Sequence, residues 1–446
     1  MAEIPLLAEK RMNKNLSKMK RYLYHMPLIA LLVCSVPAMA RQAEAQKQDS
    51  LGGDEFRKIR IGGYGEMLLQ RMDYSADRYT RPGGAPKESR AAISIPRTVF
   101  ALDYKFNPSW IFSTEVEFEY GGTGVARELE YDEAGEYELE LEKGGEVVLE
   151  QFHITKVFAP EAQIRFGHMV VPVGLTNAYH EPVNYFGTTR PEGEMTIIPC
   201  TWHETGIAFR GGWKGLNYEA MVINGLDPNG FSSGYWVRKG KQGMFEAANF
   251  TSPAIAARLE YEGVRNLRIG ASLYWNNSAR NTVQRGKLKD YNAEVTIMTA
   301  DLQYRTRALI FRANFIYGNL SDSYAVTVAN RSIPKASGHP RTPVAKNAMN
   351  YYAEAGYDIL SFWQCKSKLY PFVRYEYYNS MQDVEGDTFK DPRYRRDIFT
   401  AGINYYPLPN LVIKADYAHR RIDYGGYNNE NTISAAVGYV VWFHKR

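Results

Sequence analysis

The feature of this chain that most limits its fold is a two-residue alternation that recurs in sixteen segments between residues 60 and 443. In the stretch FSTEVEFEY (112–120), apolar and aromatic residues form one row, and Glu115, Glu117 and Glu119 stand in the other. Successive side chains of a β-strand point to opposite faces, so this period indicates strands with one apolar and one polar face. Such strands suit either a soluble sandwich or a barrel whose apolar faces meet lipid.

The connections between the segments separate these two alternatives. We predict strands over 60–71, 94–106, 110–120, 148–158, 163–171, 204–211, 215–223, 254–262, 267–276, 294–305, 307–318, 350–360, 368–378, 397–406, 410–418 and 432–443. The connections after every second segment are tight. The others are long, and the first of these spans about 72–93 and the last about 419–431. Soluble sandwiches have irregular connections, whereas a regular alternation of short and long connections is typical of outer-membrane barrels. We therefore predict an all-β fold, a transmembrane antiparallel β-barrel of about 16 strands over 60–446, with short periplasmic turns and long extracellular loops.

The composition agrees with a barrel and not with a helical membrane protein. After the N-terminal segment, no stretch reaches the roughly 18 apolar residues that a membrane helix requires, and the mean hydropathy is −0.41. A membrane protein without such helices must close its backbone hydrogen bonds within a barrel. The chain also contains 33 Tyr, a side chain suited to the border between lipid and water.

The N-terminus reads as a targeting segment. A basic stretch precedes the short apolar run 28–36, and Ala40 or Ala45 ends a small-residue cleavage site. We predict a signal peptide over 1–45 and a flexible periplasmic leader over 46–59. The first 40 residues hold six Lys and Arg against two Asp and Glu, so the remaining chain carries 48 basic and 47 acidic residues. This balance does not support nucleic-acid binding.

Four stretches resemble conserved blocks of a known porin family: RIGGYGE (60–66), QIRFGHMVVPVGL (163–175), YPFVRYEYY (370–378) and INYYPLPNLVIKADY (403–417). The family is the phosphate-selective porin O and P family of Gram-negative bacteria. In its high tyrosine content the chain is similar to members of this family from Bacteroides-type bacteria. His168 and Val173 depart from its pattern. The resemblance implies a sixteen-stranded barrel that forms homotrimers in some members, contacts outer-membrane lipid and lipopolysaccharide, and passes small solutes or anions such as phosphate.

The alternation also predicts which charged side chains line a pore. These are Arg165, Arg258, Arg268, Arg312, Arg374, Lys414, Glu115, Glu117 and Glu119. Anion-selective pores use rings or ladders of Arg and Lys, but in this chain inward positions of both signs balance. We therefore predict a weakly selective diffusion pore with a field across its width, and not a strong anion filter.

The long connection over about 172–203 is rich in Pro, Gly and aromatic residues, which suits a loop that folds inward and narrows the lumen. Its candidate constriction residues are Tyr179, His180, Glu181 and Arg190. The alternative is an ordinary external loop.

Other motifs do not favour catalysis or a cofactor. The pairs His180-Glu181 and His203-Glu204 lack the second His, four residues later, of the zinc-protease motif, and no nucleophile motif is present.

The acidic stretch 128–146 is interpreted as a hairpin arm above the membrane, or alternatively as a site for divalent cations or lipopolysaccharide. Cys200 and Cys365 fall at opposite ends of the barrel, so we expect no disulfide. We predict no enzyme, no metal and no cofactor. The alternative to a porin is a surface-binding or adhesion module that uses loops such as 319–349.

Overall fold

The computed structural model describes residues 57–75, 85–122, 128–129, 139–140, 145–242, 248–282, 285–333, 341–363, 365–422 and 428–445. The predicted signal peptide, most of the leader and most of the acidic stretch 128–146 lie outside these residues. Within that stretch, β4 (Glu128–Leu129) pairs antiparallel with β5 (Leu139–Glu140), as a hairpin requires.

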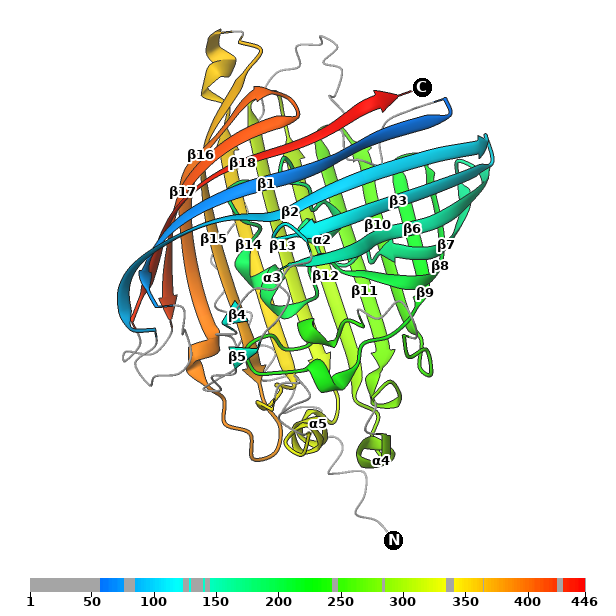
Figure 1. The fold of residues 1–446 in the computed structure, drawn as a ribbon, viewed down its shortest axis with the longest axis vertical. Coiled ribbons are helices and arrows are strands. Elements are labelled where there is room, and N and C mark those ends of the chain that lie inside the picture. Colours follow the sequence, from blue (N-terminus) through cyan, green and yellow to red (C-terminus); the bar gives the residue numbers. More distant parts are fainter. Residues whose placement is uncertain are drawn as a thin grey trace, which may run out of the picture. The chain divides into compact units, whose positions relative to one another are not determined.

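Sixteen strands form a closed antiparallel barrel, in which each strand pairs with its neighbours in the sequence and β1 closes onto β18 (Figure 1). Closure leaves no strand edge with unpaired backbone groups. The strands are β1 (Ile59–Tyr74), β2 (Lys87–Asn107), β3 (Trp110–Glu119), β6 (Glu146–Ala159), β7 (Ala162–Val170), β8 (His203–Trp213), β9 (Leu216–Ile223), β10 (Ala254–Val264), β11 (Leu267–Asn277), β12 (Glu294–Arg305), β13 (Leu309–Leu320), β14 (Asn347–Tyr357), β15 (Lys368–Asp383), β16 (Arg395–Leu408), β17 (Leu411–Ile422) and β18 (Glu430–Lys445). The predicted fold class is therefore confirmed, and each predicted strand overlaps an observed one.

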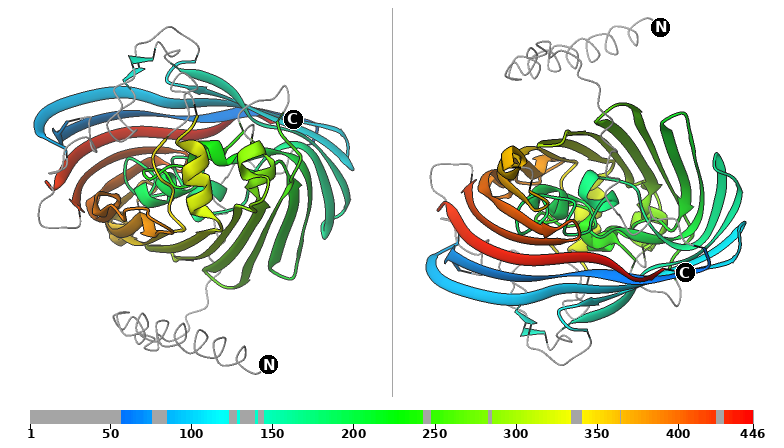
Figure 2. Two further views of the ribbon diagram at one scale, coloured as in Figure 1. Left: turned by 90° about the horizontal axis from the view of Figure 1, so that it is seen from below. Right: turned by 90° about the horizontal axis from the view of Figure 1, so that it is seen from above.

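The short turn between β8 and β9 is tight because its residues accept unusual backbone angles. Between β8 and β9, Lys214 and Gly215 have φ angles of 48° and 82°. Two successive positive φ angles are required by the two-residue turn that matches the twist of a hairpin. The long connections lie at the opposite end and contain α4 (Arg285–Leu288) and α5 (Ser323–Asn330) (Figures 1 and 2). Among the described residues, no helix has the length and apolarity to cross a membrane.

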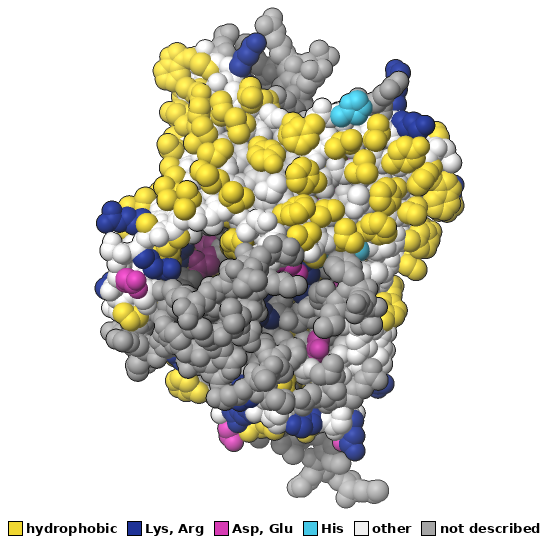
Figure 3. Space-filling model, viewed as in Figure 1, with side chains coloured by type: hydrophobic (Ala, Val, Ile, Leu, Met, Phe, Trp, Pro, Cys, Tyr) yellow, Lys and Arg dark blue, Asp and Glu magenta, His cyan; other side chains and the backbone are white. Residues whose placement is uncertain are grey.

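The two faces of the strands differ as the alternation predicts. On β13, Phe315 and Tyr317 remain 41% and 38% exposed, whereas the intervening Ile316 is fully buried. Leu259 on β10 is 57% exposed, next to the buried Arg258. Hydrophobic side chains cover much of the strand surface seen in Figure 3. An apolar surface of this extent on the outside of a closed barrel belongs in lipid.

One strand departs from simple alternation, because β6 carries a β-bulge. Glu115 of β3 pairs with Gln151, but the next residue, Val116, pairs with Leu149. The extra residue is Glu150, whose side chain is fully buried inside the barrel. Strict alternation along 148–158 would place Glu150 on the outward face with Phe152 and Ile154. The bulge shifts the phase of the strand and turns this side chain to the inner face instead.

Candidate functional site

The connection between β7 and β8, residues 171–202, folds into the barrel and crosses its interior (Figure 2). It contains α2 (Leu175–Ala178) and α3 (Glu192–Ile197). Its side chains reach widely separated strands: the Tyr179 hydroxyl donates to Glu260 of β10 at 2.8 Å, and the Tyr185 hydroxyl donates to Glu66 of β1 at 2.9 Å. We call this segment the lumenal loop.

Backbone groups of the lumenal loop are held by the barrel wall as well. The backbone N–H groups of Glu192 and Gly193 both donate to the Glu376 carboxylate on β15. A Cβ atom at Gly193 would overlap the side-chain amide of Asn350, so the close approach of the loop to the wall requires glycine there. Nearby, the ring of Phe186 stacks on Phe372 with their centroids 5.3 Å apart.

Glu194 fixes the loop from within. Its Oε1 accepts the backbone N–H groups of Thr176 and Asn177 at 2.8 and 3.0 Å, and its Oε2 accepts from Asn314 of β13 at 2.8 Å. Burial raises the pKa of Glu194 to about 7, against the opposing effect of these hydrogen bonds. One carboxyl group therefore joins the two short helices of the loop to the wall.

Three of the six predicted pore-lining cations are covered by this loop. Glu354 binds Arg312 at 2.7 Å and Arg374 at 2.8 Å, and Arg374 also donates to the carbonyl of Phe186. Lys414 donates to the carbonyl of Tyr185 at 3.1 Å. These three side chains are at most 5% exposed. Arg374 and Lys414 hold the loop through its carbonyl groups, and Arg312 lies 4.8 Å from the ring centroid of Phe186. None of the three borders either of the cavities described below.

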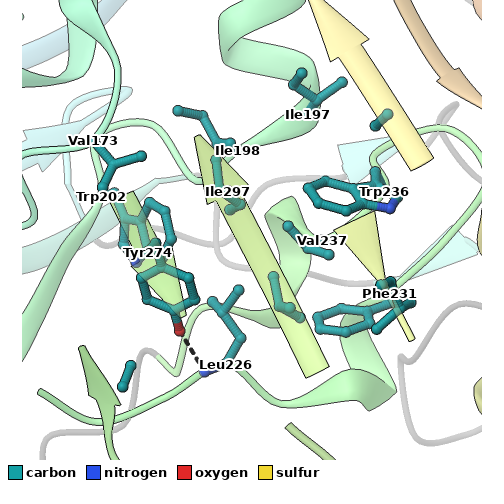
Figure 4. Packing of buried hydrophobic residues seen from close by; sticks show 14 of the residues in the cluster. Val173, Ile197, Ile198, Trp202, Leu226, Phe231, Trp236, Val237, Tyr274 and Ile297 are labelled. Atoms are coloured by element: carbon teal, nitrogen blue, oxygen red, sulfur yellow. Dashed lines mark hydrogen bonds between the residues drawn. The ribbon is translucent and has the colours of Figure 1, made fainter. Parts of the chain in front are cut away.

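A hydrophobic cluster fills part of the interior on the side of β8 to β14. Trp202 of the lumenal loop lies with its ring centroid 4.6 Å from that of Tyr274 on β11, and the Tyr274 hydroxyl accepts the backbone N–H of Leu226 (Figure 4). The loop over 224–253 adds Phe231 and Trp236, both fully buried. This hydrophobic cluster resembles the core of a soluble protein, and it confines water to the remaining part of the barrel lumen.

The larger cavity, which we call the inner cavity, has a volume of about 760 Å³. It reaches the short-turn end, where Pro160 and Lys214 line it. The other three predicted cations border it, together with one predicted pore-lining acid and three predicted loop residues; these are Arg165, Arg258, Arg268, Glu115, Tyr179, His180 and Glu181. Two of its arginines are paired with carboxylates: Arg258 lies 2.8 Å from Asp301, and Arg268 lies 3.5 Å from Glu260.

The smaller cavity, which we call the outer cavity, has a volume of about 220 Å³ and lies among the long loops. One side is acidic, formed by Glu117 and Glu119 of β3 and by Glu146 of β6. The other side carries cations of the loop over 224–253, namely Arg238, Lys239 and Lys241. Opposite charges therefore face each other across this space.

The two cavities approach each other at β3, because Glu115 borders the inner one and Glu117, the next inward residue, borders the outer one. We call this place the neck. Here the Nε2 atom of His180 lies 2.8 Å from Oε1 of Glu150, and the Tyr64 hydroxyl donates to Oε2 of Glu150 at 2.6 Å. Burial alone would lower the pKa of His180, but the Glu150 carboxylate outweighs burial and raises it to about 9.

The remaining predicted residue and the two cysteines are placed as follows. Arg190 is half-buried and donates to the hydroxyl of Thr201 at 3.3 Å. Cys200 borders the outer cavity, Cys365 is exposed in the connection between β14 and β15, and both thiols are free.

Comparisons with known proteins agree with the fold. No protein-family model matches the chain. A protein of Aquifex aeolicus (strain VF5), described as uncharacterized, is 26% identical over 381 residues, which cover 85% of this chain and 79% of that protein. Among solved structures, the OmpF complex with daunomycin of Salmonella typhi has a TM-score of 0.54 at 12% identity, covering 86% of this chain and 97% of that chain. The anion-selective porin from Comamonas acidovorans has a TM-score of 0.50 at 9% identity, covering 86% and 99%.

The fold is thus that of outer-membrane porins. Together with the apolar outer surface, this fold places the chain in the outer membrane. The predicted localisation is confirmed at this level.

The sequence did not reveal two parts of the site. Arg238, Lys239 and Lys241 stand in a loop without alternation, so no pattern assigned them to the interior. Glu150 is the second, because alternation alone would place it on the outward face. A glutamate in phase with Phe152 and Ile154 conflicts with an outward apolar row, but only the pairing with β3 identifies the bulge.

Proposed function

We propose that this chain is an outer-membrane porin that admits small hydrophilic solutes and ions by passive diffusion. The observation that carries the proposal is the pair of cavities inside the barrel, which approach each other at the neck. Solutes would pass from the outer cavity, across the neck, into the inner cavity. The lumenal loop forms the inner side of this route and is its constriction.

The pairing of charges supports weak selectivity. In the inner cavity Arg258 lies between Asp301 and Glu260, at 2.8 and 2.9 Å. Paired guanidinium groups offer little net charge to a passing anion, whereas anion filters present unpaired rings of cations. In the outer cavity acids and bases face each other, which produces a field across the route. We therefore favour a general pore over the phosphate-selective behaviour that the sequence resemblance implies.

The binding-module alternative gains no support from its candidate loop. In the described part of 319–349, Val326 and Ala329 of α5 are buried in the hydrophobic cluster, and Trp236 donates to the carbonyl of Ala345. These residues of the loop stabilise the barrel interior. Assembly into homotrimers and contact with lipopolysaccharide remain predictions.

Passive diffusion is tested by reconstituting the purified mature chain in liposomes and measuring swelling in a graded series of sugars. The proposal expects rates that fall steeply with sugar size. Liposomes that swell no faster than protein-free ones, even with the smallest sugar, would contradict it. Reversal potentials in potassium chloride and potassium phosphate gradients test selectivity separately, and a tight phosphate preference would overturn the weakly selective pore.

A further inference from the structure

Three potential metal ligands meet at the neck from distant parts of the sequence. Glu115 comes from β3, Glu150 from the bulge of β6, and His180 from the lumenal loop. One ligand atom of each lies within 4.8 Å of the others, and all three side chains are buried. The spacing of residues along the chain could not reveal this group, because each ligand belongs to a different segment.

One ligand atom in this group lacks an ordinary partner. Oε2 of Glu115 is buried and has no hydrogen-bond partner among the residues that the structure describes. A buried carboxylate oxygen without a donor is costly. Arg97 of β2 does not supply this donor: its Nε donates to Glu66 at 3.0 Å, and its guanidinium also donates to the backbone carbonyl of His180. The free oxygen of Glu115 therefore points to a missing positive ligand.

We propose that Glu115, Glu150 and His180 bind a divalent transition-metal ion, for which Zn²⁺ is the best match. An imidazole nitrogen and two carboxylate oxygens are common zinc donors, whereas Mg²⁺ and Ca²⁺ prefer oxygen ligands alone. Three protein ligands leave a fourth tetrahedral position for water or a solute.

Neighbouring groups hold two of the ligands in orientation. The second ring nitrogen of His180, Nδ1, lies 3.0 Å from the backbone carbonyl oxygen of Asn177. The Tyr64 hydroxyl donates to Oε2 of Glu150 at 2.6 Å, which leaves Oε1 for the metal. Histidine and carboxylate ligands in metal sites typically have such partners, which fix the ring and raise the basicity of the ligand.

Binding requires only a small adjustment. A tetrahedral zinc ion with bonds of about 2.1 Å holds its donors ~3.4 Å apart. The Glu150 and His180 atoms, 2.8 Å apart, must separate slightly, and Glu115 must move inward from a distance of at most 4.8 Å. The ion would replace the direct contact between Glu150 and His180 and supply the partner that Glu115 lacks.

The position of the site gives it a consequence for transport, and this part rests on the proposed function. An ion at the neck lies where the two cavities approach each other. Bound Zn²⁺ would narrow the route and offset the negative charge of Glu115 and Glu117. We expect it to lower conductance reversibly, with chelator restoring the open level.

The test measures metal binding directly, without reference to transport. The purified, chelator-treated protein in detergent is titrated with Zn²⁺ by calorimetry, and Co²⁺ is added separately to record its ligand-field absorption. Glu115→Gln is the informative variant, because the oxygen that loses its charge makes no hydrogen bond. Glu117→Gln, the next inward acid on the same strand, is the matched control, and His180→Gln is a second variant.

Saturable binding at one site is the expected result, weakened more than ~100-fold by Glu115→Gln and His180→Gln; the size follows from the loss that even indirect partners of a metal cause. Glu117→Gln should weaken binding far less, because the Glu117 carboxylate acts on the ion through its charge alone and not as a ligand. No saturable Zn²⁺ binding, or equal affinity in Glu115→Gln, would overturn the site. Conductance in chelator tests the pore independently. A conducting protein without a zinc site and a zinc-binding protein without conductance are thus distinguishable outcomes.

Discussion

His180 of the lumenal loop and Glu150 of β6 form a buried ion pair, with Nε2 of the imidazole 2.8 Å from Oε1 of the carboxylate. Glu150 is available for this pair because the bulge of β6 turns it inward. The pair fastens the loop to the strand beside the neck, so it affects both the stability of the barrel and the width of the route.

Breaking this pair should destabilise the protein. We expect His180→Gln and Glu150→Gln each to lower the free energy of unfolding by about 3–5 kcal/mol, because each leaves a buried group without its partner. The double variant should lose clearly less than the sum of the two. Urea unfolding in lipid vesicles, followed by tryptophan fluorescence, measures this. Fully additive losses would show that the two groups are not coupled.

Neutralising one side of the outer cavity should change ion selectivity. Glu117→Gln with Glu119→Gln removes two acids, so the reversal potential in a potassium chloride gradient should shift toward anions. Lys239→Gln with Lys241→Gln removes two bases from the opposite side and should shift it toward cations. The two variants serve as controls for each other. Unchanged potentials in both would mean that ions do not pass through this cavity.

The assignment of strand faces can be tested by placing an arginine on each. Leu259 lies at the middle of β10 on the outward face, so Leu259→Arg should cost about 2–4 kcal/mol in the free energy of unfolding from vesicles. Asn217 is exposed and borders the inner cavity, so Asn217→Arg should have little effect on stability. Equal costs at the two positions would contradict the division of side chains between lipid and water.

Cys200 offers a chemical probe of the outer cavity. In a Cys365→Ser background, a positively charged methanethiosulfonate reagent added from the long-loop side should react with Cys200 and lower the conductance. Burial raises the pKa of the Cys200 thiol, so the reaction should be faster at pH 9 than at pH 7. A Cys200→Ser variant is the control. Full labelling without any change in conductance would place the route elsewhere.

The barrel could be predicted from the sequence because its signals are local. A two-residue period follows from strand geometry itself, so Phe315 and Tyr317 reveal their face without knowledge of any partner. The alternation of short and long connections then indicates an antiparallel barrel in which successive strands pair. Strand ends were less accurate: β15 runs to Asp383, past the predicted end at 378, because its final turn residues still pair with β14.

The interior could be predicted only in part because its contacts are not local. The length and composition of the lumenal loop suggested an inward fold, but its partners lie on strands as far as 229 residues away in the sequence, as with Tyr185 and Lys414. For the same reason alternation placed Arg312 and Arg374 on the inward face but could not indicate that the loop covers them. The acidic and basic sides of the outer cavity come from a strand and an irregular loop, which no single period connects.

Single-channel conductance in planar bilayers, in the presence of chelator, is the sharpest test of a water-filled route beside the lumenal loop. We expect stepwise openings for the mature chain and larger steps for a variant that lacks residues 178–198. Circular dichroism and heat-dependent gel mobility verify that both barrels are folded. A folded mature chain that gives no steps, or a folded variant whose steps equal those of the mature chain, would contradict such a route.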